Sequence, residues 1–360
     1  MRISLCMIVR DEADTLARCL EPLQGVVDEL CIVDTGSTDG TLALARELGA
    51  RATSFEWCDD FSAARNACLK IASGDWVLVL DADEFLIPDG ARAALLEFAQ
   101  AHPAAIGRVR IKNIEVAGGS AGSSTHISRF FPRCDELRFA GRVHEQLVHS
   151  AAEPERLDTG VAALHHGYTH EALVSRRKLE RNRALVTRAL EEAPLDAYLW
   201  YQLGRTEFVA EDHTAAWQAL FRSIELLDGE RTPFVALLFE TAAYSLRALG
   251  RSEEALALLV PLVPRFKERP DMLFAQALLW MDTGRLAEAE AGFRACLLLE
   301  GADPEGGESA LCASTWAPAF NLGVMHEMLQ KTAAALDWYR RALAHRPDHQ
   351  PSLSGIARCS

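Results

Sequence analysis

The chain has 360 residues, of which 49% are hydrophobic and 24% are charged, a composition typical of a globular protein with room for two domains. Its formal net charge of −14 argues against nucleic acid or an anionic membrane as a partner. No stretch approaches the roughly 20 apolar residues of a membrane-spanning helix, and the first apolar run is too short for a signal peptide. The nine cysteines are scattered, odd in number and without zinc-ligand spacing, so we expect reduced thiols and a cytoplasmic protein.

The first part of the chain alternates short apolar runs with helical patterns. The predicted strands are 3–9, 29–34, 51–55 and 76–80, and the predicted helices are 12–23, 42–48 and 61–72. Such alternation predicts an α/β fold with a parallel sheet and helices on both faces.

The fourth predicted strand ends in the acidic residues Asp81, Asp83 and Glu84. Carboxylates are costly to bury without a partner, so we expect them at the carboxyl edge of the sheet, where open α/β sheets bind ligands. Asp81 and Asp83 are two residues apart, so on an extended backbone they would point the same way and could share one divalent cation. An acidic loop after a buried strand is the alternative, and this motif alone does not exclude it.

The predicted sheet has no glycine-rich loop of the kinds that bind dinucleotides or triphosphates, so it lacks their cradle of backbone amides. A diphosphate bound here would need another positive group. A metal ion on Asp81 and Asp83 would supply it.

The pattern changes after residue 98. Strands over 106–114 and 127–132 are predicted in a smaller mixed region, and the segment 117–124, rich in glycine and serine, is predicted to be a mobile loop. The polar clusters 138–146 and 163–168 follow.

From residue 171 onward the pattern is helical and repetitive. Gly250–Ala255 recurs as Gly284–Ala289, 34 residues later, and looser copies surround Gly204 and Gly323. This is the period of tetratricopeptide helix pairs, although an unrelated helical bundle is an alternative. A polar insertion is predicted at 301–309. Stacked repeats would form a concave groove for a peptide or protein, or an interface for a homo-oligomer.

Four ordered motifs carry a family resemblance: residues 6–12, 33–41, 59–66 and 80–84. They resemble the nucleotide-sugar glycosyltransferases of family 2, which have the GT-A fold, and in particular the subgroup that includes the S-glycosyltransferases of glycopeptide bacteriocins, often joined to tetratricopeptide repeats. The resemblance implies a GT-A domain over 1–168 and a repeat domain over 169–360.

The resemblance also implies donor-site roles. Ile8 and Arg10 would line the base pocket, and Asp34 would accept a hydrogen bond from the uracil of a UDP-sugar. Arg65 would contact the base or ribose, or pair with the aspartates; a purely structural ion pair is its alternative.

The same resemblance implies a Mn²⁺ or Mg²⁺ ion. Asp81 would reach the ribose or the metal, and Asp83 would hold the metal. His165 resembles the histidine that some GT-A enzymes add as a third ligand, with a hydrogen-bonded structural histidine as the rival interpretation.

Family 2 enzymes invert the anomeric centre and need a carboxylate that takes the acceptor's proton. Glu145 is the candidate base, and a loop-holding ion pair with Arg142 or Arg138 is its structural alternative. We therefore expect a metal-dependent inverting hexosyltransferase that uses a UDP-sugar and a peptide or protein acceptor. The alternatives are a protein-binding scaffold with a degenerate sugar-nucleotide domain and a transferase with a carbohydrate acceptor.

Overall fold

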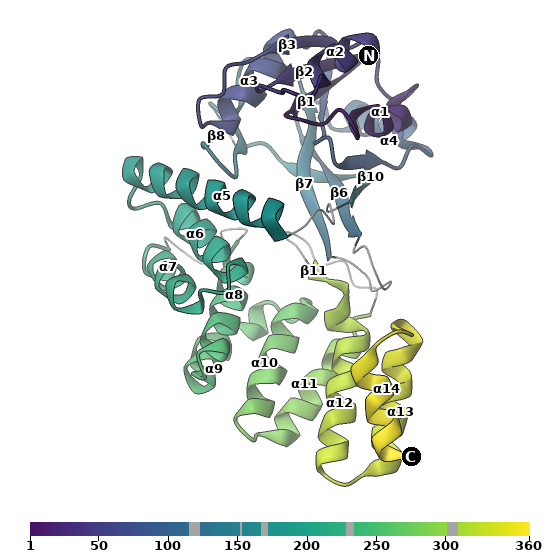
Figure 1. The fold of residues 1–360 in the computed structure, drawn as a ribbon, viewed down its shortest axis with the longest axis vertical. Helices are drawn as coiled ribbons and strands as arrows, with labels where there is room; N and C mark the ends of the chain where they lie inside the picture. The colour runs from purple at the N-terminus through teal and green to yellow at the C-terminus, as the bar shows by residue number, and fades with distance from the viewer. Residues whose placement is uncertain (115–122, 152, 167–171, 228–233, 301–308) are drawn as a thin grey trace. The chain divides into compact units, whose positions relative to one another are not determined.

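The computed structural model describes residues 1–114, 123–151, 153–166, 172–227, 234–300 and 309–360 (Figure 1). They fall into two compact units. The first unit contains the described residues of 1–114, 125–175 and 184–189. The second unit contains those of 115–124, 176–183 and 190–360. The predicted domain boundary at 168/169 lies outside the described residues and stays a prediction. The loop predicted over 117–124 also lies outside them, apart from Ser123 and Ser124, which belong to a strand and not to a loop.

The first unit is built on a mixed sheet. Its strands, in spatial order, are β3 (Arg51–Ser54), β2 (Glu29–Asp34), β1 (Ile3–Val9), β4 (Trp76–Val79), β7 (Ser123–Pro132), β6 (Ile106–Ile114), β10 (Arg156–His166) and β5 (Glu84–Leu86). The first four strands are parallel, and β7 runs antiparallel to β4. β10 is parallel to β6 and antiparallel to β5. The predicted parallel sheet and the mixed region after it are thus parts of one sheet.

Helices cover both faces of this sheet, as predicted. They are α1 (Leu16–Leu20), α2 (Thr41–Glu47), α3 (Phe61–Ile71) and α4 (Ala91–Ala101). Leu5 and Met7 of β1 belong to a buried cluster with α1, α2 and α4, whereas Cys6 belongs to the cluster on the α3 side. Successive side chains of a strand point to opposite faces, which explains the division.

The first helix is shorter than predicted. It begins at Leu16 and continues as the 3₁₀ turn η1 (Glu21–Leu23), and the residues before Leu16 bond to the segment that follows β2. The amide of Asp11 donates to Ser37 Oγ at 2.8 Å and that of Glu12 donates to Thr41 Oγ1 at 2.8 Å. These bonds tie the loops after β1 and β2 together.

The polar cluster predicted around 138–146 contains strands that the sequence did not indicate. β8 (Leu137–Ala140) and β9 (Gln146–His149) form a two-stranded antiparallel sheet. Glu145 immediately precedes β9, so this small sheet determines where Glu145 lies.

The second unit consists of helix pairs, as the repeat predicts. After α5 (Ala172–Glu192), which has residues in both units, the helices are α6 (Ala197–Val209), α7 (His213–Glu225), α8 (Val235–Ala248), α9 (Ser252–Leu259), α10 (Pro270–Asp282), α11 (Leu286–Leu297), α12 (Trp316–Met328), α13 (Thr332–His345) and α14 (Gln350–Cys359). Short elements between them are η2 (Val263–Arg265), β11 (Ser309–Ala310) and η3 (Leu311–Ser314).

Small residues allow the paired helices to approach closely. A Cβ at Gly204 would lie 2.5 Å from Leu220 Cγ, and one at Gly323 would lie 2.6 Å from the ring of Tyr339. The predicted insertion at 301–309 lies outside the described residues apart from Ser309. Within the described ranges, no helix combines the length and the apolar character that crossing a membrane requires.

Candidate active site

The carboxyl ends of β1, β2 and β4 lie at one edge of the sheet because these strands are parallel. Asp34 is the last residue of β2 and is in register with Val9 at the end of β1. Ile8 in the same strand is half-buried, and Arg10, just beyond it, is exposed. The fold thus brings three of the predicted donor-site residues to neighbouring strand ends.

Asp34 has one engaged and one unengaged carboxylate oxygen. Oδ1 accepts hydrogen bonds from the amides of Gly36 at 2.9 Å and Ser37 at 2.8 Å. Oδ2 is buried and has no hydrogen-bond partner among the described residues, although Asp34 is only 2% exposed. An unpaired buried acceptor is uncommon in folded proteins, and a ligand with an N–H group would satisfy it.

Asp81 and Asp83 lie in a tight turn between β4 and β5, not on an extended strand. The Glu84 amide donates to the Asp81 carbonyl oxygen at 3.0 Å, and the Asp81 amide donates to Glu84 Oε2 at 3.0 Å. The strand-alternation argument that made the two aspartates point the same way is therefore wrong, because their direction is set by this turn.

Asp81 is held between two arginines. Its Oδ1 accepts from Arg65 Nη2 at 2.8 Å, and its Oδ2 accepts from Arg129 Nη2 at 2.8 Å. Burial alone would raise the pKa of Asp81, but Arg129 and Arg65 hold it well below its usual range. The carboxylate is therefore ionised at every physiological pH.

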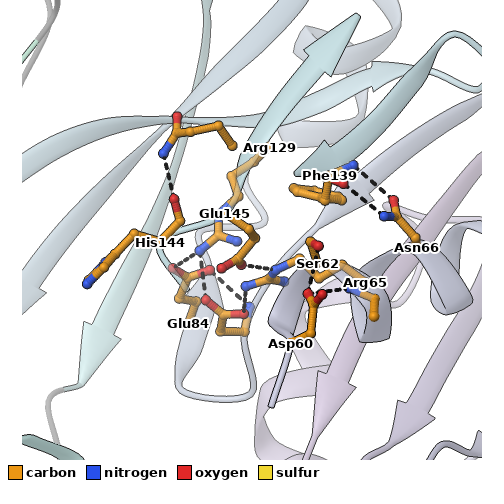
Figure 2. A network of polar contacts seen from close by, with 12 residues as sticks. Asp60, Ser62, Arg65, Asn66, Glu84, Arg129, Phe139, His144 and Glu145 are labelled. Atoms are coloured by element: carbon orange, nitrogen blue, oxygen red, sulfur yellow. Dashed lines mark hydrogen bonds and ion pairs between the residues drawn. The ribbon is translucent and has the colours of Figure 1, made fainter. Parts of the chain in front are cut away.

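The network continues on both sides of Asp81. Arg65 Nε donates to Glu145 Oε1, and Arg129 Nη2 also contacts Glu84 Oε1 at 2.6 Å. Figure 2 shows these charged groups directed toward one another. Arg65 and Arg129 are each less than a tenth exposed, so the carboxylates compensate charges that would otherwise be costly to bury.

Neighbouring bonds fix Arg65 on α3. The side chain of Asn66 donates to the Phe139 carbonyl oxygen at 2.8 Å and accepts from the Phe139 amide at 2.9 Å, which ties α3 to β8. The Arg65 guanidinium also lies 5.6 Å from the centroid of the Phe139 ring. At the start of the helix, Asp60 accepts from the Ala63 amide at 2.9 Å, which is a normal N-cap.

Asp83 and His165 form a second pair. His165 Nε2 lies 3.1 Å from Asp83 Oδ2, and His165 Nδ1 lies 2.7 Å from Asn113 Oδ1. The sheet sets this arrangement, because His165 is in register with Asn113 on β6 and with Glu84 on β5. These contacts fit the hydrogen-bonded structural histidine that the sequence left as the rival interpretation. A proton on Nε2 would donate to Asp83, and a divalent cation could take the place of that proton between the imidazole and the carboxylate.

A carboxylate and an imidazole suit a divalent cation that takes its other ligands from a substrate diphosphate and water. In the described part of the chain, no three or more His, Cys, Asp or Glu side chains are grouped so that they alone could hold a metal. Asp83 and His165 would then be two ligands of such a cation, and its remaining ligands would have to come from elsewhere.

The structure resolves some of the alternatives left open by the sequence. The predicted ion pair between Arg65 and an aspartate is confirmed, whereas contact with the base or ribose stays a prediction. Glu145 forms its ion pair with Arg65, where the sequence suggested Arg142 or Arg138. Arg129 and Asn113 were not predicted to take part in the site, and the one available signal was the charge of Arg129 directly before the apolar pair Phe130 and Phe131.

Comparisons with known proteins agree with this geometry. Residues 4–179 match the family described as Glycosyl transferase family 2, and residues 171–233 and 241–306 match the tetratricopeptide repeat. A TPR repeat-containing protein of Synechococcus elongatus is 39% identical over 211 residues, which cover 56% of this chain and 51% of that protein. The SPbeta prophage-derived glycosyltransferase SunS of Bacillus subtilis is 26% identical over 230 residues, covering 62% of this chain and 53% of SunS.

Solved structures are also similar to this chain, and two of them are described here. One is Staphylococcus aureus TarS 1–349 in complex with UDP-GlcNAc, with a TM-score of 0.42 and 15% identity over 74% of this chain and 92% of that chain. The other is the TPR protein YrrB, with a TM-score of 0.40 and 23% identity over 51% of this chain and 87% of that chain. The chain spans about half the length of the curated relatives from Synechococcus and Bacillus. It carries a glycosyltransferase domain of family 2 followed by tetratricopeptide repeats.

Proposed function

We propose that this chain is a metal-dependent inverting glycosyltransferase that moves a hexose from a UDP-sugar to a peptide or protein acceptor. The observation that carries the proposal is the turn between β4 and β5. It brings Asp83 to His165 at 3.1 Å and Asp81 to Arg65 at 2.8 Å, and Arg65 in turn holds Glu145. Relatives named as glycosyltransferases support the same activity.

The donor's base would bind at the ends of β1 and β2. Asp34 Oδ2, which has no partner among the described residues, would accept the N–H of uracil. Ile8 and Arg10 would line the pocket from the neighbouring strand end.

Asp83 and His165 would hold Mn²⁺ or Mg²⁺, and this ion would neutralise the negative charge that develops on the departing UDP. Asp81 would assist as a ligand of the ribose or the metal. Both of its oxygens accept from arginine, but each carboxylate oxygen has a further lone pair.

Glu145 would be the base. Its Oε1 is anchored by Arg65, so Oε2 is the oxygen that would act. Oε2 would take the proton from the acceptor's hydroxyl or thiol while the oxygen or sulfur attacks the anomeric carbon. The bond from that carbon to the UDP oxygen breaks on the opposite side, so the configuration inverts.

The repeats would present the acceptor, since stacked helix pairs form extended concave surfaces that bind peptides. A homo-oligomer formed through the repeats and a cytoplasmic location stay predictions.

A donor screen tests the proposal. UDP-, GDP- and dTDP-sugars are incubated with the full chain and Mn²⁺, and slow release of the nucleotide is measured. We expect release from UDP-sugars that is lost with a chelator and in the Asp83→Ala variant. Asp75→Ala is the matched control, because Asp75 precedes the other end of β4 and bonds the Arg2 amide at 2.8 Å.

Release by Asp83→Ala with the metal dependence of the wild type would contradict the proposal. Absence of any stabilisation of the wild type against heat by UDP and Mn²⁺ would favour the alternative function, a binding scaffold with a degenerate sugar-nucleotide domain.

A further inference from the structure

Arg129 is a buried cation without a role in the mechanism described so far. It lies on β7, next to Phe130, which is in register with Leu78 of β4, and it is 7% exposed. A buried guanidinium is costly unless carboxylates compensate it, so its partners indicate why it is there.

Among the described residues, both ion-pair partners of Arg129 come from the turn between β4 and β5. A single nitrogen, Nη2, lies 2.8 Å from Asp81 Oδ2 and 2.6 Å from Glu84 Oε1. Asp81 and Glu84 are the first and last residues of the turn, and Figure 2 shows Arg129 reaching Glu84 from its own strand. One cation therefore joins the two ends of the turn.

The position of the residues between Asp81 and Glu84 depends on Arg129 holding these two ends of the turn together. Without Arg129, the carboxylates of Asp81 and Glu84 would repel each other, and Arg65 would be the one remaining cation paired with Asp81 among the described residues. Asp83 lies between them in sequence and is directed toward His165 at 3.1 Å. A change in the turn would therefore be transmitted directly to Asp83.

We propose that Arg129 is a positioning residue, which joins the two ends of the turn 81–84 so that Asp83 is presented to the metal ion beside His165. This inference rests on the proposed function. Arg129 is not a catalytic residue in this account, because it acts through Asp81 and Glu84.

The test uses the full chain and measures UDP binding by calorimetry at increasing Mn²⁺ concentrations. We expect Arg129→Met to raise the Mn²⁺ concentration for half-maximal UDP binding by about 10- to 100-fold, the usual effect of losing a group that orients a metal ligand. Binding of uridine, which has no phosphates, is followed by NMR and is expected to stay unchanged. Arg129→Lys is expected to recover part of the loss, because one ammonium nitrogen can replace the single Nη2.

Arg108→Met is the matched control. Arg108 lies on the adjacent strand β6, and its buried Nε has no partner among the residues that the structure describes. We expect this variant to keep the Mn²⁺ dependence of the wild type.

If Arg129→Met does not fold, the double variant Arg129→Met/Glu84→Gln replaces it, since it removes one buried charge of each sign. Wild-type Mn²⁺ dependence in a folded variant that lacks Arg129 would overturn the proposal. Equal weakening of uridine binding and Mn²⁺-dependent UDP binding would overturn it as well, because the role would then be structural only. Failure of the proposed function would appear differently, as absence of UDP binding in the wild type itself.

Discussion

Replacing Asp34 by asparagine separates its structural role from its proposed role in recognising the base. The asparagine oxygen can still accept from the Gly36 and Ser37 amides, which lie 2.9 and 2.8 Å from Asp34 Oδ1. Its amide group then takes the place of Oδ2 and presents a donor where the wild type presents an acceptor. We therefore expect the loop to stay folded and the pocket to reject uracil, whose N3 carries a proton.

The size of the effect follows from the lost bond. A hydrogen bond to a charged group contributes about 1.5–3 kcal/mol, and tenfold in affinity corresponds to about 1.4 kcal/mol. UDP should therefore bind about 10- to 100-fold more weakly to Asp34→Asn. CDP should gain affinity relative to UDP, because cytosine N3 is an acceptor that the new amide can satisfy.

Calorimetric titration of both nucleotides, with Mn²⁺ present, measures this change. Asp34→Ala is the comparison, since it also leaves the two loop amides unsatisfied and should lower the unfolding temperature. UDP affinity equal to that of the wild type, or equal losses for UDP and CDP, would refute the placement of the base beside Asp34.

Three further predictions concern the base, acid stability and the repeats. Glu145→Gln should lower kcat for transfer by about 100- to 10,000-fold with the Kd for UDP unchanged, since the amide oxygen can still accept from Arg65; an unchanged kcat would exclude Glu145 as the base. Burial would raise the pKa of Glu29, but hydrogen bonds from neighbouring residues lower it to about 2, so its contribution to stability is complete above its ordinary value of about 4.5 and is lost as pH falls toward 2. In urea unfolding, Glu29→Gln should thus be less stable than the wild type at pH 7, and the two should converge near pH 2; a difference that persists there would contradict this. Gly323→Ala should destabilise the helices by about 1–3 kcal/mol, because its Cβ would lie 2.6 Å from Tyr339. Circular dichroism in urea measures this loss of stability. Adding Tyr339→Leu to the same chain should recover part of the loss, and no recovery would show that the clash is not the cause.

Local sequence patterns predicted the elements that local interactions determine. Buried strands such as Trp76–Val79 are apolar runs bounded by glycine and acidic residues, and helix pairs recur with the spacing of Gly250 and Gly284. The start of α1 was predicted too early: Glu12, the first residue of the predicted helix, instead bonds through its amide to Thr41, 29 residues away. A prediction from a short stretch of sequence cannot include a bond between residues so far apart.

The same reason explains which site residues the sequence did not indicate. Arg129 lies 48 residues from Asp81, and Asn113 lies 52 residues from His165. Each is brought to its partner by the order of strands in the sheet, where β7 follows β4 and β6 adjoins β10. Asp34, Asp81 and Asp83 could be predicted as candidates because an acid at the end of an apolar strand is visible without knowledge of its neighbours.

The buried charges also bear on the choice between an enzyme and a binding scaffold. Arg65, Arg129, Glu84 and Glu145 have side chains between 6% and 12% exposed, and a well-packed apolar set of the same volume is often as stable or more stable than such a network. Stability alone therefore does not account for these groups. A site that orients ionised side chains around a diphosphate and a metal does account for them, because the fixed charges are already in place when the leaving group becomes negative. A scaffold that needed only its repeats would gain nothing from keeping them, so the network favours the transferase.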